Sequence, residues 1–262
     1  NAHWLRMGAS RSSPGRTAWP KEQADIRPRL PHQQAMSGSV LIFGASGGVG
    51  AALADVREAQ GKGPVFRFSR QAGDFDLTDE SSIARCVARA TEAGPPELCI
   101  VATGLLSRAE HRPERAIREL NADWMAENFA INTIGPALIA KHVAAALPRG
   151  QRSVLALLSA RVGSISDNRL GGWHSYRASK AALNMIVKGV ALELARTRPE
   201  AICVALHPGT VETGLSAPFR SGGDEGVHSP AHAANCLLDV IDRLTPADSG
   251  KCFAWDGQEI PA

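Results

Sequence analysis

A phenol and an amine stand four residues apart in the segment SYRASKAA, residues 175–182. Residues 176–195 carry apolar side chains at three- and four-residue steps with no proline, which predicts a helix. On a helix, Tyr176 and Lys180 share one face, one turn apart. A phenol, with a pKa of about 10, is a poor acid at neutral pH, and a neighbouring ammonium favours its ionised form. The pair therefore predicts proton exchange with a carbonyl oxygen, although this spacing also occurs on solvated helix faces.

A glycine-rich turn follows the first apolar stretch of the chain. Residues 39–43 (SVLIF) predict a strand buried on both faces, and residues 51–60 predict a helix. The turn between them, GASGGVG, is typical of a pyrophosphate cradle, because glycines permit close backbone approach and the first N–H groups of a helix lack partners. An ordinary β–α turn is the alternative. The residues predicted to contact the cofactor here are Gly44, Ser46, Gly47, Gly48 and Val49.

The end of the second predicted strand, residues 64–69 (PVFRFS), indicates which dinucleotide binds. Proteins specific for NAD place a carboxylate there for the ribose hydroxyls. Residues 67–73 contain no acid, and Ser69 and Arg70 stand at the strand end. A guanidinium and a hydroxyl bind a 2′-phosphate that a carboxylate would repel. NADP(H) is therefore predicted to be preferred and NAD(H) to be possible; alternatively, Arg70 is a surface residue beside a turn.

Strands and helices alternate along the rest of the chain. Further strands are predicted at 98–102, 154–158, 202–206 and 252–255, and further helices at 80–93, 121–147 and 230–244. This rhythm predicts right-handed crossovers and a parallel sheet covered on both faces. We expect an α/β protein with a three-layer, doubly wound domain spanning residues 37–262 and large enough for a substantial core.

Composition and charge exclude several other classes of protein. Of the formal charge of +3, residues 1–36 hold +4, so the remainder is near −1 and shows no basic stripe for nucleic acid. There is no uninterrupted apolar run of about 18 residues, so no membrane span is expected. The five cysteines are scattered, without Cys-x-x-Cys or a His/Cys cluster. This pattern predicts no metal site, and free thiols in a reducing compartment, here the cytoplasm.

Residues 1–36 contain four prolines, several Ser and Arg, and no hydrophobic period. They predict a disordered extension. An Arg- and Ser-rich, acid-poor segment also fits an organellar transit peptide, but the prolines oppose the amphipathic helix that such a peptide needs. A reading frame extended upstream of a natural start at Met36, which would make the extension non-native, is favoured over a targeting role.

The motifs together resemble those of the short-chain dehydrogenases/reductases over residues 38–258. They occur in the family's order: Gly44-x-x-x-Gly48-x-Gly50, Asn132, Tyr176-x-x-x-Lys180 and PGTVET at 208–213. The segments GSISDN (163–168) and FAWDG (253–257) are similar to the C-factor-like, sniffer-type carbonyl reductase branch. The resemblance implies a Rossmann fold with a seven-stranded, mainly parallel sheet and hydride exchange between NAD(P) and a small carbonyl or alcohol substrate. It also implies a homo-oligomer, a dimer or a tetramer, formed through the helices around 121–147 and 176–196.

The resemblance also implies roles for individual residues. Tyr176 would donate or accept the proton, and Lys180 would lower its pKa and hold the nicotinamide ribose. Asn132 would kink its helix and anchor a water. The remaining cofactor contacts that the resemblance implies are Asp76, Leu77, Ala102, Thr103, Gly104, Pro208, Gly209, Val211 and Thr213. From the residues themselves, Trp173, residues 216–228 and residues 253–255 are expected to wall a small substrate pocket. The Gly-rich segment 214–228 is expected to form a mobile lid over it.

The sequence departs from the family at the catalytic serine. The family pattern is Ser-Ser-x-x-Gly, and here Ser159-Ala160-Arg161-Val162-Gly163 places Ala160 at the catalytic position. Ser159, through a local bulge, or Ser164 would have to supply the hydroxyl, and we assign Ser159 to the catalytic set. Loss of such a donor typically costs about 10²–10³ in rate. A catalytically weak or inactive dinucleotide-binding signalling protein, C-factor-like, is therefore the alternative to an NADP(H)-preferring oxidoreductase.

Overall fold

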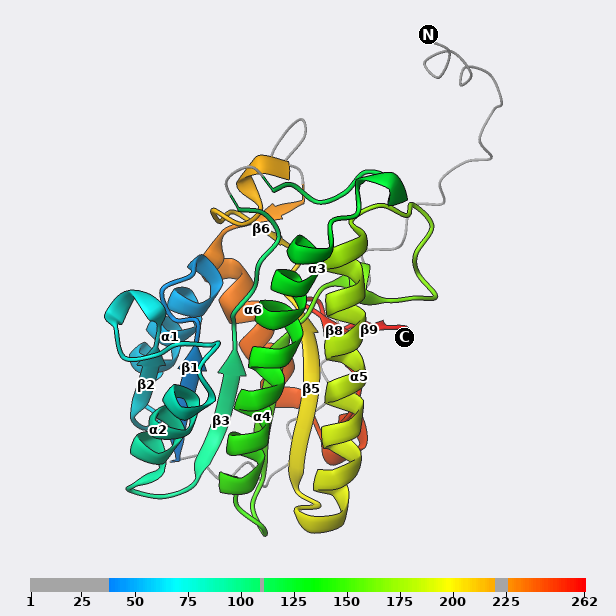
Figure 1. The fold of residues 1–262 in the computed structure, drawn as a ribbon. Helices are drawn as coiled ribbons and strands as arrows, with labels where there is room; N and C mark the ends of the chain where they lie inside the picture. Colours follow the sequence, from blue (N-terminus) through cyan, green and yellow to red (C-terminus); the bar gives the residue numbers. More distant parts are fainter. Residues whose placement is uncertain (1–37, 109–110, 220–225) are drawn as a thin grey trace, which may run out of the picture. The chain divides into compact units, whose positions relative to one another are not determined.

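The computed structural model describes residues 38–108, 111–219 and 226–262, so the predicted extension at 1–36 lies outside the described residues. Seven strands form one sheet in the order β2-β1-β3-β4-β5-β8-β9 (Figure 1). Neighbouring strands are parallel except for β9, which runs antiparallel to β8. The strands are β1 (Ser39–Phe43), β2 (Val65–Phe68), β3 (Pro96–Val101), β4 (Ser153–Leu158), β5 (Ala201–His207), β8 (Cys252–Ala254) and β9 (Glu259–Ile260).

Helices cover both faces of this sheet. One apolar core lies between the sheet and helices α2, α4 and α5, and a second lies between the sheet and helices α1 and α6. Along β1, Leu41 and Phe43 enter the first core while Val40 and Ile42 enter the second, as the period of a strand requires. The predicted three-layer, doubly wound α/β fold is confirmed. The helices are α1 (Gly48–Gln60), α2 (Glu80–Thr91), α3 (Ala122–Phe129), α4 (Gly135–Ala146), α5 (His174–Thr197) and α6 (Pro230–Arg243).

The strand order reverses at β1. β2 pairs with one edge of β1, and β3 pairs with the other edge. The connection after β1 and the connection after β3 therefore lead in opposite directions along the sheet. Open parallel sheets bind their ligands at such a point, outside the carboxyl ends of the strands. At this edge the N–H of Gly44 donates to the carbonyl of Phe68 at 2.9 Å, and that of Ala102 donates to Phe43 at 2.7 Å. The topology therefore brings the glycine turn and the 102–104 segment to one crevice.

The single helix predicted at 121–147 is divided in the structure. A π-helical turn, Ala130–Ile134, separates α3 from α4. Asn132 lies in this turn, and its fully buried amide bonds to the backbone of Leu105 rather than to solvent. A π-turn is a frequent feature of functional sites because it redirects one side chain without ending the helix. The π-turn thus interrupts the regular α-helical pattern at the residue where the resemblance implies a kink, Asn132.

The stretch Ala122–Ala146 is also long and apolar enough to cross a membrane by length and composition alone. The search for an uninterrupted apolar run did not detect this property. In the structure, α4 packs against α2, α5 and strands β3 and β4, with Ile139, Ala140 and Val143 fully buried in the first core. This packing accounts for the buried apolar residues of α4, while Ile134 in the π-turn is 53% exposed.

Two short strands that the sequence pattern did not indicate form a separate sheet. In it β6 (Thr210–Val211) pairs in parallel with β7 (Val227–His228). Of the predicted lid at 214–228, residues 220–225 lie outside the described residues, and Ala217–Phe219 form a 3-10 turn. Strands of two residues are too short to show a period, so only the fold reveals the pairing of residues 210–211 with residues 227–228.

Candidate active site

Two glycines of the cradle are required by close backbone contacts. Gly44 has φ +86°, and a Cβ there would lie 2.8 Å from the carbonyl carbon of Ala102. A Cβ on Gly50 would lie 2.3 Å from the carbonyl oxygen of Gly44. Among the described residues no side chain caps α1, whose N-cap residue is Gly47. The first N–H groups of α1 therefore remain available to an anion at the crevice.

The 208–213 segment packs against this turn. A Cβ on Gly48 would lie 2.6 Å from Cγ2 of Thr213, so the Thr213 side chain packs directly on the Gly48 backbone. On its other side, a Cβ on Gly209 would lie 2.9 Å from the rings of both His228 and Trp255. Four residues of this segment, Pro208, Gly209, Val211 and Thr213, were assigned to cofactor binding. Thr213 lies against the glycine turn, Gly209 packs on His228 and Trp255, and Val211 is buried.

A cavity of about 430 Å³ opens between the glycine turn and the end of β2. It brings together six residues that the sequence assigned to cofactor binding: Gly44, Ser46, Ser69, Arg70, Asp76 and Leu77. Gln71, Phe75 and Ile131, which sequence reasoning missed, complete its lining. Apolar walls with a few polar groups are typical of a nucleoside pocket.

The two arginines near this cavity have different partners. The guanidinium of Arg67 forms ion pairs with two carboxylates of α1, with Glu58 at 2.7 Å and with Asp55 at 2.6 Å. Within the described part of the chain, Arg70 forms no ion pair, and it lines the cavity. Ser69 beside it is buried, and its hydroxyl accepts the N–H of Ala72 at 3.2 Å. Arg70 is therefore the guanidinium that is available for a ligand phosphate.

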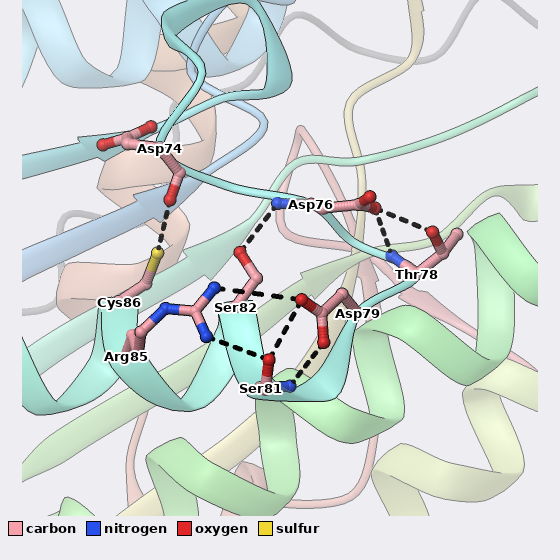
Figure 2. Close-up of polar contacts among 8 residues, drawn as sticks. All are labelled: Asp74, Asp76, Thr78, Asp79, Ser81, Ser82, Arg85 and Cys86. Carbon is pink, nitrogen blue, oxygen red and sulfur yellow. Dashed lines mark hydrogen bonds and ion pairs between the residues drawn. The ribbon is translucent and has the colours of Figure 1, made fainter.

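Asp76 lines the cavity, and Figure 2 shows the polar contacts of its carboxylate and its backbone N–H. Its carboxylate accepts the N–H and the hydroxyl of Thr78 at 2.8 and 2.7 Å, and its own N–H donates to Ser82 at 3.0 Å. The hydrogen bond from the Thr78 N–H, followed by that from its hydroxyl, lowers the pKa of Asp76. The carboxylate is thus ionised and pre-oriented as an acceptor for an amine or a hydroxyl.

The segment after β3 carries a hydroxyl that lacks a partner. Thr103 Oγ1 is buried and makes no hydrogen bond with any described residue. A Cβ on the following residue, Gly104, would lie 4.0 Å from Lys180 Nζ and 3.8 Å from Asn132 Oδ1. Buried hydroxyls are rarely left unpaired in native proteins unless a water or ligand meets them. The residues present therefore fit a cofactor with polar ribose groups running from the cavity toward Lys180.

The Tyr176–Lys180 pair lies where α5 passes the carboxyl end of β4. Lys180 is 3% exposed, and its Nζ donates to the carbonyl of Leu158 at 2.8 Å. The same Nζ lies 5.9 Å from the centroid of the Tyr176 ring. A Cβ on Gly163 would lie 2.9 Å from the Lys180 backbone, so the turn after β4 packs directly on this part of α5. The fold thus directs the amine of α5 to the crevice.

The titration of the pair differs in direction from the sequence-based expectation. Burial raises the pKa of Tyr176 to about 12 and lowers that of Lys180 to about 8. The expected lowering of the Tyr176 pKa is wrong for the protein alone, because loss of hydration outweighs the neighbouring ammonium. The Tyr176 side chain as a whole is half-buried, so hydration moderates the rise. At neutral pH the site therefore holds a protonated phenol and a mostly protonated amine.

A network of buried amides fixes the middle of the site. Asn132 Nδ2 lies 2.8 Å from the carbonyl of Leu105, 3.2 Å from Oδ1 of Asn128 and 3.1 Å from Oγ of Ser179. The Ser179 hydroxyl donates in turn to the carbonyl of Tyr176 at 2.8 Å. Sequence reasoning missed Asn128 and Ser179. A second asparagine four residues before Asn132 in a helical pattern was the available signal for Asn128.

The serines near Ala160 are bound to protein groups. The Ser159 hydroxyl is buried and donates to Oδ1 of Asn184 at 2.7 Å, on α5 one turn beyond Lys180. The Ser164 hydroxyl accepts the N–H of Asp167 at 3.1 Å. Ala160 itself is 8% exposed and precedes the turn that packs on α5. Donation by Ser159 to a substrate would require its side chain to leave Asn184, so its catalytic assignment stays a prediction.

These features define a class of protein: a Rossmann-fold, NAD(P)-dependent oxidoreductase. A family model described as "Enoyl-(Acyl carrier protein) reductase" matches residues 45–239, more than half of the chain. The chain belongs to the short-chain dehydrogenase/reductase family.

Individual relatives agree with this assignment. C-signal of Myxococcus xanthus is 37% identical over 147 residues, covering 56% of this chain and 83% of that protein. The 1-hydroxy-2-glutathionyl-2-methyl-3-butene dehydrogenase of Rhodococcus sp. is 29% identical over 231 residues, covering 84% and 97%. NADPH-bound carbonyl reductase from chicken fatty liver superposes with a TM-score of 0.73 at 26% identity, covering 86% and 98%. Carbonyl reductase Sniffer of D. melanogaster, with a TM-score of 0.69 at 20% identity over 86% and 99%, shows the shared fold.

Proposed function

We propose that the protein is an NADP(H)-preferring carbonyl reductase or alcohol dehydrogenase for a small substrate, with Tyr176 as the acid or base. The observation that carries the proposal is the arrangement on α5. A phenol lies beside a buried amine, and that amine is held at the carboxyl end of β4 near the backbone of Gly104. We call the cavity of about 430 Å³ at the ends of β1 and β2 the adenosine cavity.

The residues divide the chemistry among them. A bound nicotinamide supplies or accepts the hydride. Tyr176, protonated at neutral pH, donates its phenolic proton to the carbonyl oxygen as the alcohol forms, and accepts a proton in the reverse direction. Lys180, fixed by the Leu158 carbonyl, presents N–H donors toward Gly104, where ribose hydroxyls would bind. Asn132 holds the Gly104–Leu105 backbone against the π-turn, which keeps the floor of the site rigid.

Preference for NADP(H) is supported by charge at the end of β2. Arg70 is available within the described chain, whereas Arg67 is paired with two carboxylates of α1. A carboxylate that would select NAD is absent from residues 67–73. NADPH-bound carbonyl reductase from chicken is among the structural relatives. A 2′-phosphate beside Arg70 would form a charge-assisted hydrogen bond.

The test combines binding with turnover. We expect the protein to bind NADPH, measured by calorimetry, and to oxidise it with members of a panel of small aldehydes, ketones and quinones, measured by loss of absorbance at about 340 nm. Tyr176→Phe should lower kcat by about 10²–10⁴ with little change in NADPH affinity, because only the proton donor is removed. Full activity in Tyr176→Phe would refute the assignment.

One observation favours a second function, a dinucleotide-binding signalling protein with little or no turnover. Ala160 occupies the position of the substrate-polarising serine, and the nearby hydroxyls of Ser159 and Ser164 are bound to protein groups. The similarity to C-signal points the same way. Tight NADPH binding without oxidation by any member of the panel would support this function and exclude the reductase.

The predicted assembly and location extend the proposal. Exposed apolar side chains on α5 and the π-turn, namely Met185 (71%), Leu192 (54%) and Ile134 (53%), support a homo-oligomer formed through these helices. Light scattering of the purified protein would measure its mass. All five cysteines are free, and four of them are buried. Free buried thiols support a reducing, cytoplasmic compartment, which fractionation of the source cells would test.

A further inference from the structure

Helix α5, which carries Tyr176 and Lys180, receives no capping hydrogen bond from the side chain of its N-cap residue. Its N-cap residue, Trp173, has a left-handed backbone with φ 51°, the sole positive φ among the described non-glycine residues. An indole has no hydrogen-bond acceptor, so Trp173 cannot satisfy the N–H groups of the first turn. Those groups need an acceptor from elsewhere, because a buried N–H without one is costly.

Glu114 supplies that acceptor from the connection between β3 and α3. Its carboxylate is 3% exposed and accepts the N–H of Ser175 at 3.2 Å as well as the Ser175 hydroxyl. The backbone carbonyl of Glu114 accepts the N–H of Trp173 at 2.5 Å. A buried carboxylate at the positive end of a helix makes charge-assisted hydrogen bonds and favourable dipole interactions.

The contacts of Glu114 converge on the residues around Tyr176. Ser175 is the residue immediately before Tyr176, and the ring of Trp173 stands edge-on to the Tyr176 ring with centroids 6.2 Å apart. A Cβ on Gly172 would lie 3.2 Å from the Glu114 carbonyl, so the turn that enters α5 packs directly on Glu114. Glu114 thus holds both the catalytic turn and the aromatic side chain beside it.

We propose that Glu114 is a positioning residue for the reaction: it fixes the first turn of α5 so that the phenol of Tyr176 keeps its place relative to Lys180. The inference rests on the proposed function. Lys180 has its own anchor in the Leu158 carbonyl, and the adenosine cavity lies on β1 and β2. Loss of Glu114 therefore loosens the proton donor while the cofactor contacts persist.

Because the phenol and the cofactor are held by different residues, substitutions of Glu114 should lower kcat and leave NADPH affinity nearly unchanged. Glu114→Gln keeps the side-chain shape but removes the charge, and we expect kcat to fall on the order of tenfold. Glu114→Ala removes the acceptor, and we expect a fall of about 100-fold, the size typical of misplacing a reactive group by about 1 Å. Ser175→Ala, which keeps the N–H contact, should resemble Glu114→Gln. NADPH affinity should remain within about twofold of wild type in all three variants.

The chain offers a matched control in Glu97. It is also buried, at 7% exposed, and its carboxylate accepts the N–H of Gly38 at 2.7 Å at the amino end of β3, away from the crevice. Glu97→Gln should lower the Tm as Glu114→Gln does, yet leave kcat unchanged. Suppose that Glu97→Gln, for the same loss of Tm, lowers kcat as much as Glu114→Gln does. Glu114 would then act only through stability, and the proposal would be overturned.

An activity-independent measurement separates this inference from the proposed function. Tyr176 is the sole tyrosine of the chain, so ¹³C-labelled tyrosine gives one NMR resonance that reports its titration. Burial raises its pKa to about 12, so release of the first turn in Glu114→Ala should move the pKa down toward about 10. Glu97→Gln should leave it in place. An inactive wild type would refute the proposed function alone, whereas an unchanged titration in Glu114→Ala would refute the positioning role.

Discussion

The two halves of the crevice are built by different means. The cofactor half is made largely of backbone: the turn at 44–50, the uncapped start of α1 and the end of β2, all within a short stretch of sequence. The other half, which we propose to be catalytic and call the catalytic half, depends on side chains from distant segments. Glu114 contacts the start of α5, Asn132 contacts Leu105 and Ser179, and Lys180 contacts β4.

This difference shows where the protein can change and still bind a dinucleotide. A backbone cradle needs glycine at a few positions and tolerates most changes elsewhere. A side-chain site depends on each donor, and here Ala160 stands where the family pattern has a serine, beside an intact glycine turn. The following variants test the two halves separately.

Among the variants in this series, Gly50→Ala should have the largest effect, and the property that changes should be cofactor binding. A Cβ there would lie 2.3 Å from the carbonyl oxygen of Gly44, a backbone atom that can move only by opening the turn. We expect NADPH affinity to drop by about 100-fold, near 3 kcal/mol, as measured by calorimetry.

Gly189→Ala is the control for that substitution. It lies within α5, and a Cβ there meets nothing within 4 Å. It should stabilise the protein by about 0.5–1 kcal/mol without altering NADPH affinity. Wild-type binding by Gly50→Ala would contradict the close-approach argument.

Ala160→Ser should act on the catalytic half and raise activity. A hydroxyl at the position that the family pattern assigns to the substrate donor should increase kcat by about 10-fold or more, because such donors are worth about 10²–10³. Steady-state kinetics at saturating NADPH measures the gain. Ala160→Cys, of similar size but a weak donor, should give little increase; an equal increase in both variants would show that size rather than donation matters.

Arg70→Ala should change cofactor preference more than cofactor affinity in general. We expect the Kd for NADPH to rise by about tenfold and that for NADH to stay the same, since only the former has a 2′-phosphate. Arg67→Ala, whose side chain is already paired with Glu58 and Asp55, should affect both cofactors alike. Equal losses for NADPH and NADH in Arg70→Ala would exclude a phosphate contact.

The smallest effect should be that of pH on carbonyl reduction. With its pKa raised to about 12, Tyr176 keeps its proton, so kcat should vary by less than about twofold between pH 6 and 7.5. Lys180, with its pKa lowered to about 8, loses its proton above that value, and NADPH affinity should then weaken as pH rises. A kcat that falls steeply between pH 6 and 7.5 would show that another group is the acid.

The sheet, its layers and the cofactor half of the crevice were predictable because their signals are local. Apolar runs such as 39–43 follow from burial on both faces, and the glycine turn follows directly after the strand that it serves. The strand pair β6 and β7 was missed because two residues show no period. The π-turn emerged only as a kink implied by Asn132, since its cause is a contact with Leu105 from another segment.

The sequence by itself determined the order of strands and helices, the cradle for a dinucleotide and the pairing of Tyr176 with Lys180 on one helix face. Only the tertiary structure decided the titration of that pair, since hydration is lost through packing by other segments. It also decided that Glu114 caps the catalytic helix and that Ser159 donates to Asn184. The apolar periods of helices and strands depend on residues close together in the sequence. Buried charge and hydrogen bonding instead depend on which distant residues the fold brings together.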